Sequence, residues 1–184
     1  TEGTDYGSIS DITINAGDTT GTATFDPTDD SIYEGNETAT VSIASVVGAD
    51  AGSTTSQTIT ITDNESAPTV TLATSASSIA ENAGSSLTLT ATLSVATTAD
   101  VTVGISTSGT GTEGTDYSTI SDITISAGAT TGTATFTPTD DSIFEGNETG
   151  IVAIDTVSGG SATEDGTQSV TITITENESA PTVT

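Results

Sequence analysis

Apolar and polar residues alternate along most of the chain between residues 67 and 178. The clearest series is 87–93, where three leucines and an alanine alternate with threonines. Shorter series of the same kind occur at 101–105, 123–125, 134–136, 152–154 and 170–174. A period of two places the apolar side chains on one face of a strand, and β-branched threonine suits the solvated face. Gly-rich or acidic turns separate the series. The pattern predicts an all-β fold, an antiparallel Ig-like β-sandwich of about seven strands.

The chain contains one unit almost twice. TEGTDY at 1–6 returns at 112–117, TTGTATF at 19–25 returns at 130–136, and NESAPTVT at 64–71 returns at 177–184. The offset of 111 to 113 residues is the size of a domain, which is larger than a solenoid repeat. We therefore expect tandem sandwiches: 1–66 is the C-terminal part of a repeat, 67–179 is a complete repeat, and 180–184 begins a next one. Short Pro-containing connections predict units held end to end.

The charge and composition of the chain limit the kinds of partner and ligand that it can bind. The 184 residues include 26 Asp and Glu but no Lys, Arg or His, for a net charge of −26. Phosphate contacts need basic side chains, so nucleic acid is not an expected partner. There is no Cys, and no apolar run is long enough to insert into a membrane. Oxygen ligands remain, and they suit hard cations, above all Ca2+. The Thr-, Ser- and Gly-rich composition predicts a secreted or cell-surface protein.

One acidic stretch is present in both units. TDDSIYEGNET at 28–38 and TDDSIFEGNET at 139–149, here called the acidic loops, differ only where Tyr33 becomes Phe144. Their spacing is not that of an EF-hand. A calcium ion takes six to eight oxygens, so other acids must lie close to the loop. Candidates in the complete unit are Glu81, Asp116, Glu176 and Glu178. The alternative is a solvated loop without any ion.

Four motifs in order resemble the Calx-beta domain family: IAENAG at 79–84, GTDY at 114–117, DDSIFEGNE at 140–148 and ITITENE at 172–178. The resemblance implies a calcium-binding β-sandwich, and it implies ligands by position. In the complete unit these are Glu81, Asp116, Asp140, Asp141, Glu145, Glu148, Glu176 and Glu178, with the carbonyl of Ile143. In the partial unit they are Asp5, Asp29, Asp30, Glu34, Glu37 and Asp63, with the carbonyl of Ile32.

The leading functional hypothesis is a calcium-binding structural repeat of an extracellular stalk, adhesin or filament. Its expected partners are neighbouring repeats of the same chain, with self-association into fibres as an extension. One alternative is a calcium-sensing regulatory module, and another is a strand-complemented subunit of a surface fibre. An enzyme is not expected, because a glycosidase built on paired carboxylates usually needs aromatic sugar platforms and the chain has no Trp.

Overall fold

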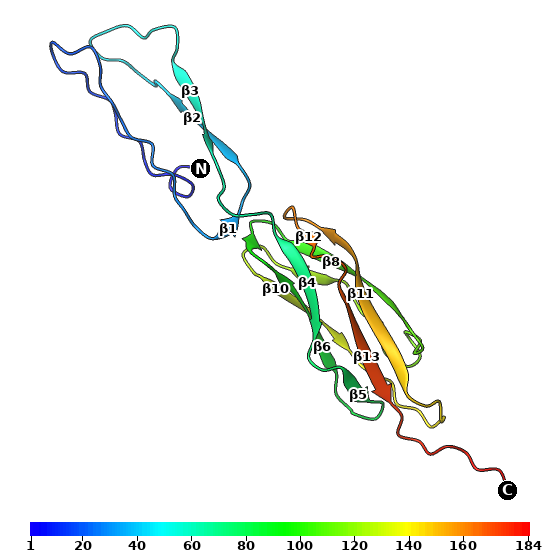
Figure 1. Cartoon of the computed structure of the whole chain (residues 1–184). Coiled ribbons are helices and arrows are strands. Elements are labelled where there is room, and N and C mark those ends of the chain that lie inside the picture. Colours follow the sequence, from blue (N-terminus) through cyan, green and yellow to red (C-terminus); the bar gives the residue numbers. More distant parts are fainter.

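The computed structural model describes residues 1–184 as thirteen strands with no helix, and hence no helix that could cross a membrane. Two units lie end to end in an elongated molecule (Figure 1). The partial unit, residues 1–66, contains the N-terminus. The complete unit, residues 67–179, follows it, and the last residues leave from its far end. The all-β class predicted from the period-two pattern is confirmed.

Two sheets form the complete unit. The first has the order β10-β6-β4-β12, from Thr131–Phe136, Leu87–Leu93, Thr69–Thr74 and Thr163–Glu164. The second has the order β5-β13-β11-β8-β9, from Ser78–Ala80, Ser169–Thr175, Glu148–Ser158, Val101–Gly109 and Ile123–Ile125. The long neighbours are antiparallel, whereas the short strands β5 and β12 pair in parallel with β13 and β4.

The core lies between these sheets and follows the alternation. In β6, Leu89, Ala91 and Leu93 are buried while Thr88 and Thr92 are exposed. Eighteen buried residues from both sheets form one apolar cluster. Eight strands of the complete unit are longer than two residues, where the pattern predicts about seven; the two-residue β7 (Ala96–Thr97) and β12 are additional. The sandwich therefore rests on aliphatic side chains, with two aromatic rings at one end.

Those two rings connect the core to the acidic loop. Tyr117 and Phe136 are almost fully buried, and their ring centroids are 4.6 Å apart. Gly150, in β11, lies against this pair: a Cβ there would come within 2.7 Å of the Phe136 ring. Tyr6 and Phe25 form the same pair in the partial unit, with centroids 4.7 Å apart. Because Asp5 and Asp116 directly precede the tyrosines, the ring pair positions one candidate ligand in each unit.

The partial unit has fewer strands. Only β2 (Glu37–Ser42) and β3 (Ser56–Ile61) pair within it, in antiparallel register. Residues 12–14 form no strand, although their copies 123–125 form β9. The physical reason is pairing: β9 pairs with β8, which has no counterpart within 1–66. Ile12 and Ile14 are accordingly 57% and 56% exposed, whereas Ile123 and Ile125 are fully buried.

A backbone pairing joins the two units. The acidic loop of the partial unit contributes β1 (Ile32–Tyr33), which pairs in parallel with β7 of the complete unit, Ile32 with Ala96 and Tyr33 with Thr97. This junction lies beside the 62–68 connection in Figure 1. Backbone groups of the two units are thus paired to each other, so the contact is more than a tether.

Candidate metal centre

Seven carboxylates lie close together at the end of the complete unit that is opposite the partial unit. They form three groups in which one oxygen from each member lies within 4.8 Å of the others: Glu81 with Glu176 and Glu178, Glu81 with Asp141 and Glu145, and Asp116 with Glu145 and Glu148. Glu81 and Glu145 each belong to two groups, so the three groups are one continuous cluster. All seven residues were predicted from the sequence as ligand candidates.

Strand pairing explains why residues so far apart in sequence meet here. The parallel pairing of β5 with β13 sets Ala80 beside Thr175, so Glu81 and Glu176 leave the sheet next to each other. The Glu81 amide also donates to the Thr175 carbonyl (3.0 Å). On the other side of β13, Glu148 pairs with Ile174. The cluster is therefore built on the end of one sheet, a more rigid support than a single loop.

The acidic loop adds its own local hydrogen bonds. Asp141 Oδ1 accepts from the amide of Ile143 (2.7 Å), a turn in which an aspartate side chain caps the backbone two residues on. The same bond joins Asp30 and Ile32 in the partial unit (2.7 Å). Glu81 Oε1 accepts a longer bond from the Asp141 amide (3.3 Å). The second acid of each Asp-Asp pair thus shapes the loop as well as supplying an oxygen.

Glu176 occupies a small anion-binding concavity of the backbone. Its Oε2 accepts from the consecutive amides of Glu145 (2.6 Å) and Gly146 (2.8 Å). Gly146 has φ of 81°, the left-handed conformation that directs two successive N–H groups at one anion. Oε1 accepts two more bonds, from the amides of Asn177 and Glu178 (both 3.0 Å). Glu176 therefore holds the acidic loop against the end of β13.

Asp63 has the same place in the partial unit. Its Oδ2 accepts from the amides of Glu34 (2.8 Å) and Gly35 (2.6 Å), and Oδ1 accepts from Glu65 (2.9 Å). Asn36 Oδ1 accepts from the Asp63 amide (3.0 Å), as Asn147 Oδ1 does from Glu176. Sequence reasoning predicted both acids as ligands and gave no sign of this role in holding the loop.

Crowding shifts the acidity of the cluster. Loss of hydration raises the pKa of Glu81, Glu145 and Glu148, and neighbouring carboxylates raise it further. When protonated, Glu178 can donate a hydrogen bond to the Glu176 carboxylate, and this raises the pKa of Glu178 to about 7. Backbone amides, that of Glu178 first, lower the pKa of Glu176 to about 2. A positive charge placed among these carboxylates would therefore stabilise them, and the chain has no basic side chain to provide one.

One oxygen of the cluster has no partner. Glu178 Oε2 is inaccessible to solvent and makes no hydrogen bond, while Oε1 accepts from Asn177 Nδ2 (2.9 Å). Buried polar atoms are nearly always paired, so an unpaired one indicates a site for a proton or an ion. The residues present fit a hard cation, because every candidate metal-ligand atom is a carboxylate oxygen and none is a nitrogen or sulfur.

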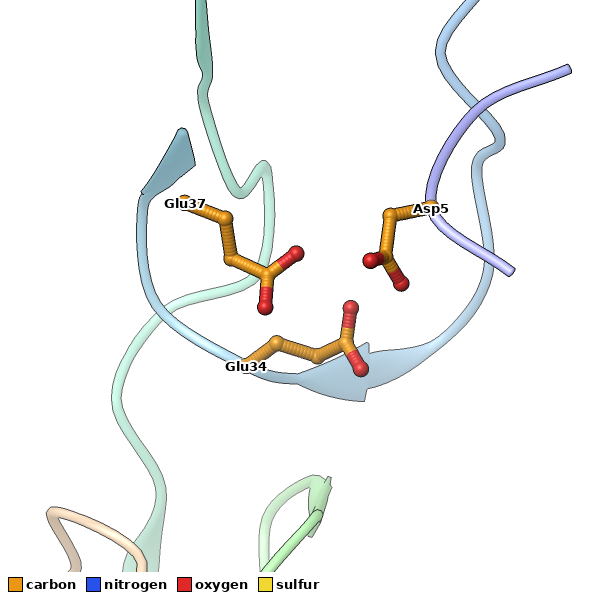
Figure 2. Close-up of side chains that lie close together, drawn as sticks. All are labelled: Asp5, Glu34 and Glu37. Carbon is orange, nitrogen blue, oxygen red and sulfur yellow. The ribbon is translucent and has the colours of Figure 1, made fainter. Parts of the chain in front are cut away.

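The partial unit has a smaller version of the cluster. The carboxylates of Asp5, from the N-terminal segment, and of Glu34 and Glu37, from the acidic loop, point toward one another (Figure 2), with oxygens within 4.8 Å. They border a cavity of about 40 Å³. Its lining includes three further candidates and one acid that the sequence analysis missed: Asp30, Ile32, Asp63 and Glu65.

Three candidates lie outside both the carboxylate groups and the cavity lining. Asp140 acts at longer range, where its charge contributes to the raised pKa of Glu81 and Glu178. Asp29 acts in the same way on Glu65. The side chain of Ile143 is 62% exposed at the loop tip. The missed residue, Glu65, is the repeat equivalent of Glu178, so comparison of the two units was the signal that could have identified it.

Comparisons with known proteins agree with this architecture. The Calx-beta domain family matches residues 1–65 and 63–178. A solved structure described as the apo form of the Calx CBD1 domain has a similar fold, with a TM-score of 0.51 and 16% identity. The similarity covers 62% of this chain and 100% of that one. No curated protein sequence is significantly similar. Since the family match extends over both units, the chain belongs to the Calx-beta domain family, whose members are calcium-binding β-sandwich modules.

Proposed function

We propose that this chain is a calcium-binding structural repeat of an extracellular stalk, adhesin or filament. The observation that carries the proposal is the continuous cluster of seven carboxylates at the end of the complete unit, in a chain without a basic side chain. Family membership supports calcium as the ion. Secretion, and fibres of adjoining repeats, are the context in which such a cluster is useful, because extracellular calcium is abundant enough for weak sites.

The residues divide into two roles. Glu81, Asp116, Glu145 and Glu148 have raised pKa values or lie directly against such groups, and they hold the ion. Glu176 uses its oxygens mainly to hold the acidic loop. A bound calcium ion supplies positive charge and fixes the strand ends on which these acids stand.

The position of the partial unit's cluster supports a structural role. Asp30, Glu34 and Glu37 belong to the same acidic loop as β1, which pairs with the complete unit. An ion held by that loop fixes the segment that joins the two units. A regulatory sensor would instead need a large change in the angle between units, which small-angle scattering with and without calcium measures directly.

Isothermal titration of the full chain tests the proposal. We expect calcium to bind and magnesium to bind far more weakly, because Mg2+ requires a tighter octahedral site. Glu148→Gln removes a charged ligand and should weaken calcium binding about tenfold or more, a loss of about 1.4 kcal/mol. Asp155→Asn, on the same strand but exposed and outside the cluster, is the matched control and should bind as the native chain does. Absence of calcium binding in the native chain would refute the proposal.

A further inference from the structure

The two acidic loops show one structure in two surroundings. Ile32 and Tyr33 form β1 against the complete unit, where both side chains are half-buried. Ile143 and Phe144, the same positions in the other loop, pair with nothing and are 62% and 43% exposed. An exposed pair of large apolar residues at a loop tip invites burial against a partner.

The free loop already has the conformation of the paired one. The Asp–Ile turn has the same length, 2.7 Å, in both copies. The two amides that follow the aromatic residue donate to one carboxylate oxygen in each case, at 2.6 to 2.8 Å. Asn147 repeats the contact of Asn36. The Ile143–Phe144 edge therefore needs little rearrangement before it can pair.

The receiving strand is equally well fixed on its own unit. Thr97 is 2% exposed, its hydroxyl donates to the Ala99 carbonyl (2.6 Å), and its carbonyl accepts from the Gly128 amide (2.8 Å). These bonds are internal to the complete unit. Any unit with the same sequence at these positions therefore presents the same short edge.

We infer that the Ile143–Phe144 edge is a docking surface for another Calx-beta repeat unit, which it contacts by parallel pairing with that unit's equivalent of Ala96–Thr97. The connecting sequence supports this occupant. NESAPTVT joins the two present units at 64–71 and recurs at 177–184, after β13. A unit that follows this second NESAPTVT connection would have its β7 equivalent beside Phe144, just as the first connection places β7 beside Tyr33.

A second copy of the present chain does not fit this edge. Its own Ala96–Thr97 is already paired with its own β1, and residues 1–66 contain no equivalent of β7. The difference between Tyr33 and Phe144 is compatible with the same docking, because the Tyr33 hydroxyl lies toward its own loop, near Gly35. Phe144 can make the same apolar contact without it. The inference rests on backbone pairing and is independent of whether an ion is bound.

Disulfide trapping in an extended chain tests the inference. Residues 72–179 are copied onto Thr184, which keeps the repeat in register because 180–184 is identical to 67–71. The chain has no Cys, so each introduced pair reports one contact. Paired Cα atoms in neighbouring strands lie about 4.8 Å apart, within disulfide range. Phe144→Cys is combined with Thr97→Cys in the copied unit, and Ile143→Cys with the copied Ala96→Cys as a second pair.

The existing junction calibrates the result. Tyr33→Cys with Thr97→Cys in the native chain should crosslink, and the new pairs should form within about tenfold of its rate. Ser158→Cys, exposed at the other end of β11, with the copied Thr97→Cys measures random collision. The inference is overturned if both new pairs crosslink no faster than this control, or if the native chain dimerises through Phe144→Cys. These crosslinking rates measure docking whether or not the chain binds calcium, so a failure of calcium binding would not affect this test.

Discussion

Removal of calcium should lower the melting temperature of the complete unit by many degrees. The cluster has seven carboxylates, which offer about fourteen oxygens. Four N–H groups already occupy the two oxygens of Glu176. About twelve oxygens remain, and an ion takes six to eight, so the cluster can hold one ion or two.

The expected size of the effect follows from linkage. A ligand that binds only the folded state adds RT ln(1 + [L]/Kd), about 2.7 kcal/mol per ion at a hundredfold excess over Kd. For a domain of about 110 residues, 1 kcal/mol moves the melting temperature by about 4 °C. One ion should therefore raise it by about 10 °C and two ions by about 20 °C.

Differential scanning calorimetry of the full chain measures this shift. The chain is scanned in chelator and then in calcium at a hundredfold excess over the measured Kd. Sodium chloride and magnesium at matched ionic strength are the necessary controls, because a net charge of −26 makes any salt stabilising by screening. If calcium raises the melting temperature by less than about 2 °C beyond magnesium, the cluster is a solvated acidic surface and the linkage argument is wrong.

Two further predictions concern single acids of the cluster. Without calcium, urea melts should show stability falling as pH rises from about 4.5 to about 7, because Glu178 has a pKa of about 7 when folded against an ordinary 4.5, so the folded state binds the extra proton in that window. Glu178→Gln should flatten this dependence, and an unchanged slope would contradict the assignment. Glu176→Gln should weaken calcium binding, because an amide nitrogen cannot accept the bonds that hold the loop. Glu176→Asp should retain binding; equal loss in both variants would contradict the holding role.

The sequence predicts the long strands well and the short ones poorly. A period-two series such as 87–93 specifies both the strand and its buried face, and β6 has that face buried. Two residues carry no period, so β7 and β12 have no local signal. Their pairing is set by tertiary contacts, in β7 by the partial unit's loop. The absence of strands at 12–14 has the same origin, because a strand exists only where its partner does.

Side-chain chemistry in the cluster was more predictable than backbone geometry. Repetition of DDSI-x-EGNE, together with the family resemblance, identified all seven acids that converge in the complete unit. The left-handed glycines that follow Glu34 and Glu145 were not predicted to bind a carboxylate. Such a contact depends on the φ of one residue and on an acid about thirty positions away, and no spacing in the sequence expresses it.

The change from Asp63 to Glu176 between the units shows what this position requires. Asp63 reaches the two loop amides at 2.8 and 2.6 Å, and the longer Glu176 reaches them at 2.6 and 2.8 Å. The two acids differ at their second oxygen, which accepts hydrogen bonds from two amides in Glu176 and from one in Asp63. The Asp–Ile turn keeps the same 2.7 Å bond in both loops. The position therefore requires an anion with one oxygen in the backbone concavity, and either acid leaves the loop in the conformation that gathers the other carboxylates.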